Sequence, residues 1–146
     1  MATSVIVQSL ADYTHAQLVT MPGAAFVTDE PTDVQGNDFG PTPYELLTAA
    51  LGACTAMTLQ MYARRKGYPL QEVAVEVEHD RVHADDCEEC NEPREGRIDV
   101  FRRKIVLRGP LDDAQREDLL RIASRCPVHK TLQNQPEIFD TLEVVA

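Results

Sequence analysis

Residues 42–67 read TPYELLTAALGACTAMTLQMYARRKG, and this stretch decides the fold. Thr42 can cap a helix, Pro43 suits a first helical position and Gly67 can end a helix. We therefore predict one helix from Pro43 to Lys66. One face carries Leu47, Ala50, Leu51, Cys54, Met57, Thr58 and Met61, and a second carries Leu46, Ala49, Ala53 and Ala56. Such a helix is buried on most sides, and in so short a chain we expect a partner subunit to supply part of the cover.

Periodicity and turn residues outline the other elements around this helix. Strands are predicted over residues 4–10, 17–21, 24–28, 73–83, 97–108 and 136–145, and helices over 112–125 and 127–134. Residues 29–43 are rich in Pro, Gly, Asp and Asn and form a long loop, of the kind that often carries function. We predict a single α+β domain over residues 1–146, in the order βββ-α-ββ-α-α-β, without repeat or linker.

Composition limits the class of protein. The chain has 146 residues, of which 43% are hydrophobic, 5% aromatic and none tryptophan, so we expect one aliphatic core. Its formal net charge is -10 and its first Lys or Arg is Arg64, which argues against nucleic-acid binding. The N-terminus lacks the pattern of a secretory leader, and we expect no run of about 18 apolar residues able to cross a membrane. The sequence therefore predicts a cytoplasmic protein with no membrane partner.

Cys126 lies in a setting that suits reactive sulfur. It opens the run Cys126-Pro127-Val128-His129. Proline at the next position favours Cys126 as a helix N-cap, where unpaired N–H groups and the helix dipole stabilise a thiolate. His129, one turn on, could add a positive charge or shuttle a proton, and Arg125 is adjacent in sequence. The alternative is a small residue that fills a turn.

Cys54 lies deep in the apolar helix. Free cysteine is among the most buried residue types, so a core role is the alternative here. Met57, Thr58 and Met61 share its helical face and would line an adaptable, apolar substrate pocket. One sheltered sulfur and one activated sulfur, Cys54 and Cys126, suit a two-cysteine redox reaction better than a structural disulfide.

A second cluster combines His79, His83, Cys87 and Cys90. Two imidazoles and a Cys-x2-Cys suit tetrahedral zinc. His79 and His83 would lie about 13 Å apart on an extended strand, so His83, Cys87 and Cys90 are the more feasible core of a structural zinc site. Their spacing departs from the common zinc-finger patterns, and the alternatives are a loop with reduced thiols or a labile disulfide.

Two motifs resemble those of the OsmC/Ohr superfamily, which holds the osmotically inducible and the organic hydroperoxide resistance proteins. Residues 40–54, GPTPYELLTAALGAC, resemble its first cysteine motif, and residues 126–129, CPVH, resemble its second. Residues 29–31, DEP, and the strand order also match. The resemblance therefore covers nearly the whole chain.

The resemblance implies an OsmC-like fold, an intertwined homodimer with sites at the subunit interface, and a thiol-dependent peroxidase of the stress response. Cys54 would attack the peroxide oxygen of an organic hydroperoxide and become a sulfenic acid, and Cys126 would condense with it to a disulfide. A dithiol reductant such as a dihydrolipoyl group would then reduce the pair. The family chemistry requires no metal and no bound organic cofactor.

The sequence departs from the family's peroxidases at two supporting positions. They hold the thiolate with an N-terminal arginine, whereas no Lys or Arg precedes Arg64 here. They also place a glutamate ten positions before the first cysteine, where this chain has Tyr44, with Glu45 following. We expect Arg125, His129 or a group of the partner subunit to replace the arginine, with Glu45 as a further auxiliary residue. The departures favour an alternative function, a binding or sulfur-handling protein without efficient peroxidase turnover, while the retained cysteine pair favours the enzyme.

Overall fold

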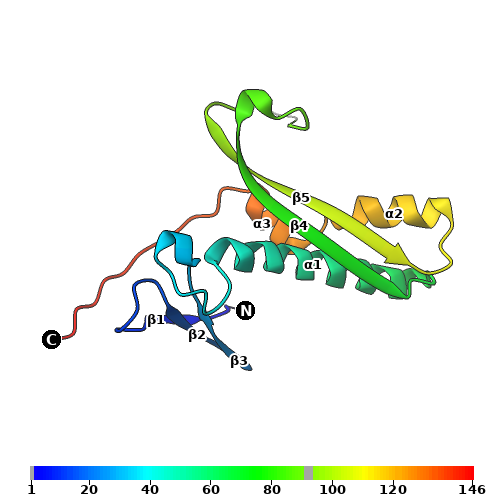
Figure 1. Cartoon of the computed structure of the whole chain (residues 1–146). Coiled ribbons are helices and arrows are strands. Elements are labelled where there is room, and N and C mark those ends of the chain that lie inside the picture. Colours follow the sequence, from blue (N-terminus) through cyan, green and yellow to red (C-terminus); the bar gives the residue numbers. More distant parts are fainter. Residues whose placement is uncertain (1, 91–93) are drawn as a thin grey trace. The chain divides into compact units, whose positions relative to one another are not determined.

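The computed structural model describes residues 2–90 and 94–146. The chain forms two compact units, residues 1–49 and residues 50–146. Helix α1 (Pro43–Lys66) begins in the first unit and continues into the second, with the bounds that the sequence predicted (Figure 1).

The first unit holds a three-stranded antiparallel sheet. Its strands are β1 (Ile6–Ser9), β2 (Gln17–Met21) and β3 (Ala24–Thr28), in that spatial order. The bounds of β2 and β3 are those predicted, and β1 is shorter than predicted. The turn between β2 and β3 contains Gly23, whose φ of 80° lies in the region that favours glycine.

Asp29 organises the loop that follows β3. Its buried carboxylate accepts hydrogen bonds from the backbone N–H groups of Glu30, Asn37 and Phe39, at 2.8, 3.0 and 3.3 Å. Burial works to raise the pKa of Asp29, but these three N–H donors outweigh it and hold the pKa below its ordinary value. The loop also needs glycine at position 36, because a Cβ there would lie 1.7 Å from the Glu30 carbonyl oxygen.

Reciprocal hydrogen bonds close the N-terminus of α1. The Glu45 N–H donates to Thr42 Oγ1 at 3.3 Å, and the Thr42 N–H donates to Glu45 Oε2 at 2.8 Å. This is a capping box, which satisfies two backbone donors that the helix leaves unpaired. Glu45, predicted as an auxiliary catalytic residue, serves as a cap in this structure.

The second unit is built on a long hairpin of β4 (Glu72–His83) and β5 (Arg97–Arg108). The register runs without a break from Glu72 opposite Arg108 to His83 opposite Arg97. Figure 1 shows the hairpin as a long twisted ribbon whose tip carries the short helix η2 (Ala84–Asp86). Two helices follow the hairpin, α2 (Asp113–Ala123) and α3 (Pro127–Gln133).

The core of the second unit is aliphatic, as the composition predicted. Its buried members are Leu59, Ala63, Leu111, Leu119, Ile122 and Ala123, drawn mainly from α1 and α2. Val73, Ile105 and Leu107 of the hairpin pack against this cluster. Packing of α1 and α2 against the hairpin fixes the end of α2, and with it the position of the cysteine that follows.

An acid group at the edge of this core binds two tyrosines. The hydroxyls of Tyr62 and Tyr68 donate to Asp118 Oδ2 at 2.7 and 2.8 Å, and Arg121 pairs with the other carboxylate oxygen. These hydrogen bonds, those from the tyrosines first, lower the pKa of Asp118 to about 2.

Asp118→Asn is expected to weaken the dependence of folding stability on pH in the acid range. The folded pKa of Asp118 lies below its ordinary value of 3.8, so its stabilising contribution is complete above that value. The contribution disappears as the pH falls toward about 2. Thermal denaturation at pH values from neutral to strongly acidic should therefore show a lower Tm for the variant near neutrality and convergence with the wild type in acid. A constant difference in Tm across this range would contradict the linkage.

Two expectations about apolar segments were wrong. The final strand predicted over residues 136–145 is absent: among the described residues this segment pairs with no strand, and its large apolar side chains are exposed. A strand needs a backbone partner, which this segment does not find within the chain.

Helix α1 is also long and apolar enough to cross a membrane by length and composition, although only 22% of its apolar 18-residue window is buried. The core helix of a soluble protein satisfies the same criteria of length and composition.

Candidate redox site

Cys126 is the N-cap of α3, as the sequence predicted. Its Sγ accepts a hydrogen bond from the backbone N–H of His129 at 3.5 Å, and Pro127 occupies the first turn. The Cys126 side chain is fully buried. The turn after α2 places it there, because the N–H groups of Arg125 and Cys126 donate back to Ile122 and Ala123.

The Cys54 side chain of α1 lies within hydrogen-bonding reach of Cys126. Both are free cysteines, and Cys54 is only partly buried. The Thr58 hydroxyl donates to the Cys54 carbonyl oxygen at 2.7 Å, one helical turn on. The fold therefore brings together two cysteines that are 72 positions apart in the sequence (126 minus 54).

The two sulfurs differ in acidity. Burial raises the pKa of the Cys54 thiol, and its hydrogen bond to Cys126 raises it further. Burial also acts to raise the pKa of Cys126, but the hydrogen bonds from Cys54 and from the His129 N–H outweigh it and lower the pKa. Cys126 is therefore the more acidic thiol of the pair.

Arg103 of β5 supplies the positive charge of the site. One terminal nitrogen donates to Thr55 Oγ1 at 2.9 Å and to the Ala123 carbonyl oxygen at 3.2 Å, and the other lies 2.8 Å from His129 Nδ1. Burial lowers the pKa of the guanidinium, and the charge of Cys126 acts to raise it. Arg103 thus joins α1, the end of α2 and α3 around the buried sulfur.

Sequence reasoning missed Arg103, although a signal was present. Arg103 occupies the face of β5 that also carries Ile105 and Leu107, which pack against the core. A charged residue on the same face of a strand as core residues needs a buried partner. That pattern marks Arg103 as a functional candidate.

The two residues expected to replace the family arginine do not supply the charge. Arg125 is exposed on the turn before Cys126. Burial first, and then the nearby Arg103, lower the pKa of His129, so its imidazole is neutral at neutral pH. With Nδ1 accepting from Arg103, the proton resides on Nε2.

An open groove of about 830 Å³ in the second unit is lined by Arg103 and His129. Its other lining includes Arg94, Arg97, Ile98, Phe101 and Leu132. The predicted substrate pocket of Met57, Thr58 and Met61 does not coincide with it. Met57 and Met61 are 60% and 69% exposed, and Thr58 is half-buried.

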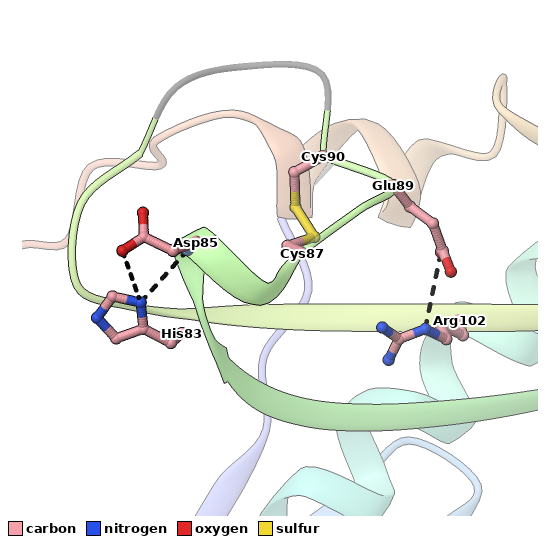
Figure 2. The surroundings of a disulfide bond; sticks show 6 residues. All are labelled: His83, Asp85, Cys87, Glu89, Cys90 and Arg102. Carbon is pink, nitrogen blue, oxygen red and sulfur yellow. Dashed lines mark hydrogen bonds and ion pairs between the residues drawn. A yellow bond between two sulfur atoms is a disulfide. The ribbon is translucent and has the colours of Figure 1, made fainter.

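Cys87 and Cys90 form a disulfide at the tip of the hairpin, with Cα atoms 5.5 Å apart (Figure 2). Zinc binding requires thiolates, so the predicted zinc set of His83, Cys87 and Cys90 is not assembled in this structure. His83 instead accepts a hydrogen bond from the Asp85 N–H at 3.3 Å. No cluster of three metal-binding side chains occurs among the residues that the structure describes. The alternative of a disulfide in this loop is the one observed.

Comparison with known proteins found one matching family. The family of OsmC-like proteins matches residues 35–139, a span that includes both free cysteines, Arg103 and the disulfide. No curated protein matches the chain.

Solved structures resemble the chain over nearly its whole length. An OsmC-like protein from Mycoplasma pneumoniae matches with a TM-score of 0.70 and 18% identity, covering 91% of this chain and 88% of that one. A putative osmotic stress induced and detoxification response protein from Psychrobacter arcticus 273-4 matches with a TM-score of 0.67 and 23% identity, covering 90% and 88%. The organic hydroperoxide resistance protein OhrB of Bacillus subtilis matches with a TM-score of 0.62 and 16% identity, covering 91% of each chain. At these identities the likeness establishes the α+β fold.

Proposed function

This chain belongs to the OsmC-like protein family, and on that premise we propose that it is a thiol-dependent peroxidase that reduces organic hydroperoxides. The observation that carries the proposal is the contact between Cys54 and Cys126, in which the pKa of Cys126 is lowered and that of Cys54 is raised. Two adjacent free thiols of unequal acidity are what a peroxide-driven disulfide cycle requires.

Access assigns the first step to Cys54. Cys126 is fully buried, whereas Cys54 is partly exposed and reaches a substrate without opening the core. The Cys54 sulfur attacks the outer peroxide oxygen, the O–O bond breaks, and the thiol proton passes to the departing alkoxide. The products of this step are an alcohol and a sulfenic acid on Cys54.

Cys126 carries out the second step. As a thiolate it attacks the Cys54 sulfenic acid, forms the Cys54–Cys126 disulfide and releases hydroxide, which takes a proton to become water. An external dithiol, such as a dihydrolipoyl group, then returns two electrons and two protons to the pair. The cycle needs no metal or organic cofactor. Arg103 and neutral His129 are positioning residues that hold the charge of Cys126 in place.

The proposal is tested by measuring the consumption of tert-butyl hydroperoxide with dihydrolipoamide as the reductant. We expect consumption of peroxide in excess over the protein. Peptide mass mapping after one equivalent of peroxide, without reductant and with the loop disulfide intact, should locate a new bond between Cys54 and Cys126. Full consumption of the peroxide with both thiols still free would contradict the mechanism. No consumption at all would favour the binding or sulfur-handling alternative.

We further propose a homodimer, because apolar surface is left uncovered on one chain. Met57 and Met61 of α1 are exposed, as are Ile138, Phe139, Leu142, Val144 and Val145 of the unpaired C-terminal segment. An exposed apolar surface of this extent marks an interaction site, and an extended segment can add a strand to a partner's sheet. We expect light scattering at micromolar concentration to give the mass of a dimer, with a buried interface above about 2,000 Å². A monomeric mass would contradict this.

The proposed location is the cytoplasm, where a dithiol-dependent cycle finds its reductant. In such a reducing compartment, a disulfide is usually catalytic or redox-sensing.

A further inference from the structure

The disulfide at the hairpin tip is not explained by the two-cysteine cycle. Cys87 is half-buried and Cys90 is exposed, so solvent-borne thiols reach this bond directly. Local contacts hold the described residues on either side of it: the Ala84 N–H donates to the Gly96 carbonyl oxygen, and the Cys87 N–H donates to the Ala84 carbonyl oxygen. It is therefore an accessible disulfide held on a defined scaffold.

Residues 87–90 fold back along β5. Glu89, between the two cysteines, lies 3.7 Å from Arg102 in an ion pair (Figure 2). Arg102 is an exposed residue of β5, and its side chain points to the opposite face of the strand from that of Arg103. The loop thus turns back over about half of the length of β5 rather than extending beyond the hairpin.

The disulfide lines the same groove as Arg103 and His129, the two residues next to Cys126. Cys87, Glu89 and Cys90 line the open groove of about 830 Å³ that Arg103 and His129 also line. The groove is strongly polar: three arginines, Arg94, Arg97 and Arg103, and two acids, Glu89 and Asp99, are among its lining residues. Once reduced, the loop cysteines supply the thiols that disulfide exchange requires.

We propose that Cys87 and Cys90 are a dithiol–disulfide relay that passes electrons from the external reductant to the Cys54–Cys126 disulfide. The relay rests on the redox pair assigned by the proposed function and explains how a half-buried disulfide is reduced. The external dithiol first reduces the exposed Cys87–Cys90 bond and is itself oxidised to a disulfide. The Cys87 thiolate then attacks Cys54, and a mixed Cys54–Cys87 disulfide forms while Cys126 departs.

The direction of attack follows from the acidity of the leaving sulfur. Exchange is faster when the departing thiol is more acidic, and the hydrogen bonds at Cys126 stabilise it as a thiolate. Attack on Cys54 therefore expels the better leaving group, and Cys54 is also the more exposed of the two. Cys90 next attacks Cys87, restores the Cys87–Cys90 disulfide and releases Cys54. One two-electron transfer is complete, and Cys54 and Cys126 are both reduced.

Reduction kinetics test the relay without peroxide. Protein oxidised at both pairs with excess diamide is mixed with dihydrolipoamide, quenched in acid at intervals and mapped by differential alkylation. In the wild type we expect the Cys87–Cys90 bond to open first, followed by the Cys54–Cys126 bond. In Cys87→Ser/Cys90→Ser we expect reduction of Cys54–Cys126 to be at least about tenfold slower. Glu88→Gln, which changes an exposed neighbour and keeps both sulfurs, should match the wild type.

A trapping variant tests the contact directly. Cys90→Ser/Cys126→Ser leaves only Cys54 and Cys87, and mild oxidation should join them within one chain. Equal reduction rates in the wild type and the double serine variant, or failure of Cys54 and Cys87 to join in a folded trapping variant, would overturn the relay. If peroxide does not oxidise the Cys54–Cys126 pair but the reduction order holds, the relay stands and the peroxidase assignment fails.

Discussion

Cys54→Ser is expected to lower hydroperoxide turnover by about a thousandfold or more, because it removes the nucleophile that attacks the peroxide oxygen. A serine hydroxyl at this position is a far weaker nucleophile than a thiol and cannot form a disulfide with Cys126. The loss should appear in kcat, with the mass, circular dichroism and oligomeric state unchanged. The measurement is steady-state consumption of tert-butyl hydroperoxide with dihydrolipoamide.

Ala53→Ser is the matched control for this variant. It adds a hydroxyl one position earlier on α1, at an exposed site, and should keep most of the activity.

Cys126→Ser provides the complementary result: Cys54 should be oxidised once, and a dimedone adduct should then mark its sulfenic acid. Retention of turnover in Cys54→Ser, or dimedone labelling of Cys126 in that variant, would reassign the attack to Cys126.

Arg103→Ala is expected to lower hydroperoxide turnover by about a hundredfold, because the preorganised positive charge beside the Cys126 sulfur is lost. The variant also leaves Thr55 and the Ala123 carbonyl without their shared donor. A structural defect alone could reduce activity, so a second readout is needed. The pKa of Cys126 should rise in the variant, and the pKa of His129 should also rise because the repulsion by Arg103 is gone.

Thiolate absorbance in the ultraviolet, followed against pH in a Cys54→Ser background, measures the first of these shifts. The titration midpoint should move to higher pH in Arg103→Ala. Lys104→Ala is the matched control, since Lys104 is the next residue of β5 and is exposed. An unchanged midpoint in a folded Arg103→Ala protein would show that Arg103 does not stabilise the thiolate, whatever its effect on turnover.

Arg103 also bears on the comparison with the peroxidases that the sequence resembles. Those proteins hold the thiolate with an arginine near the N-terminus, where this chain has none before Arg64. Here the charge comes from β5, on the face that packs against the helices. Loss of the N-terminal arginine therefore does not by itself leave the Cys54–Cys126 pair without a cation.

Local sequence alone determined the elements that depend on short-range physics. The bounds of α1 follow from Pro43 and Gly67 at its ends, and those of β2 and β3 follow from alternation around the turn at Gly23. Cys126 as an N-cap follows from the proline after it. In each case the deciding groups lie within a few residues of one another, so the chain carries the signal without reference to the fold.

Tertiary structure decided which of the candidate residues meet. Arg103 lies 26 positions before His129 and 48 after Thr55, and only the packing of β5 against α1 and α3 joins the three. The state of Cys87 and Cys90 likewise depended on the hairpin, whose tip brings the two sulfurs into a disulfide. The segment over residues 136–145 has the pattern of a strand, but pattern does not supply the backbone partner that a strand requires. Side-chain identity sets what each residue can do, and long-range packing sets which neighbours and charges it meets.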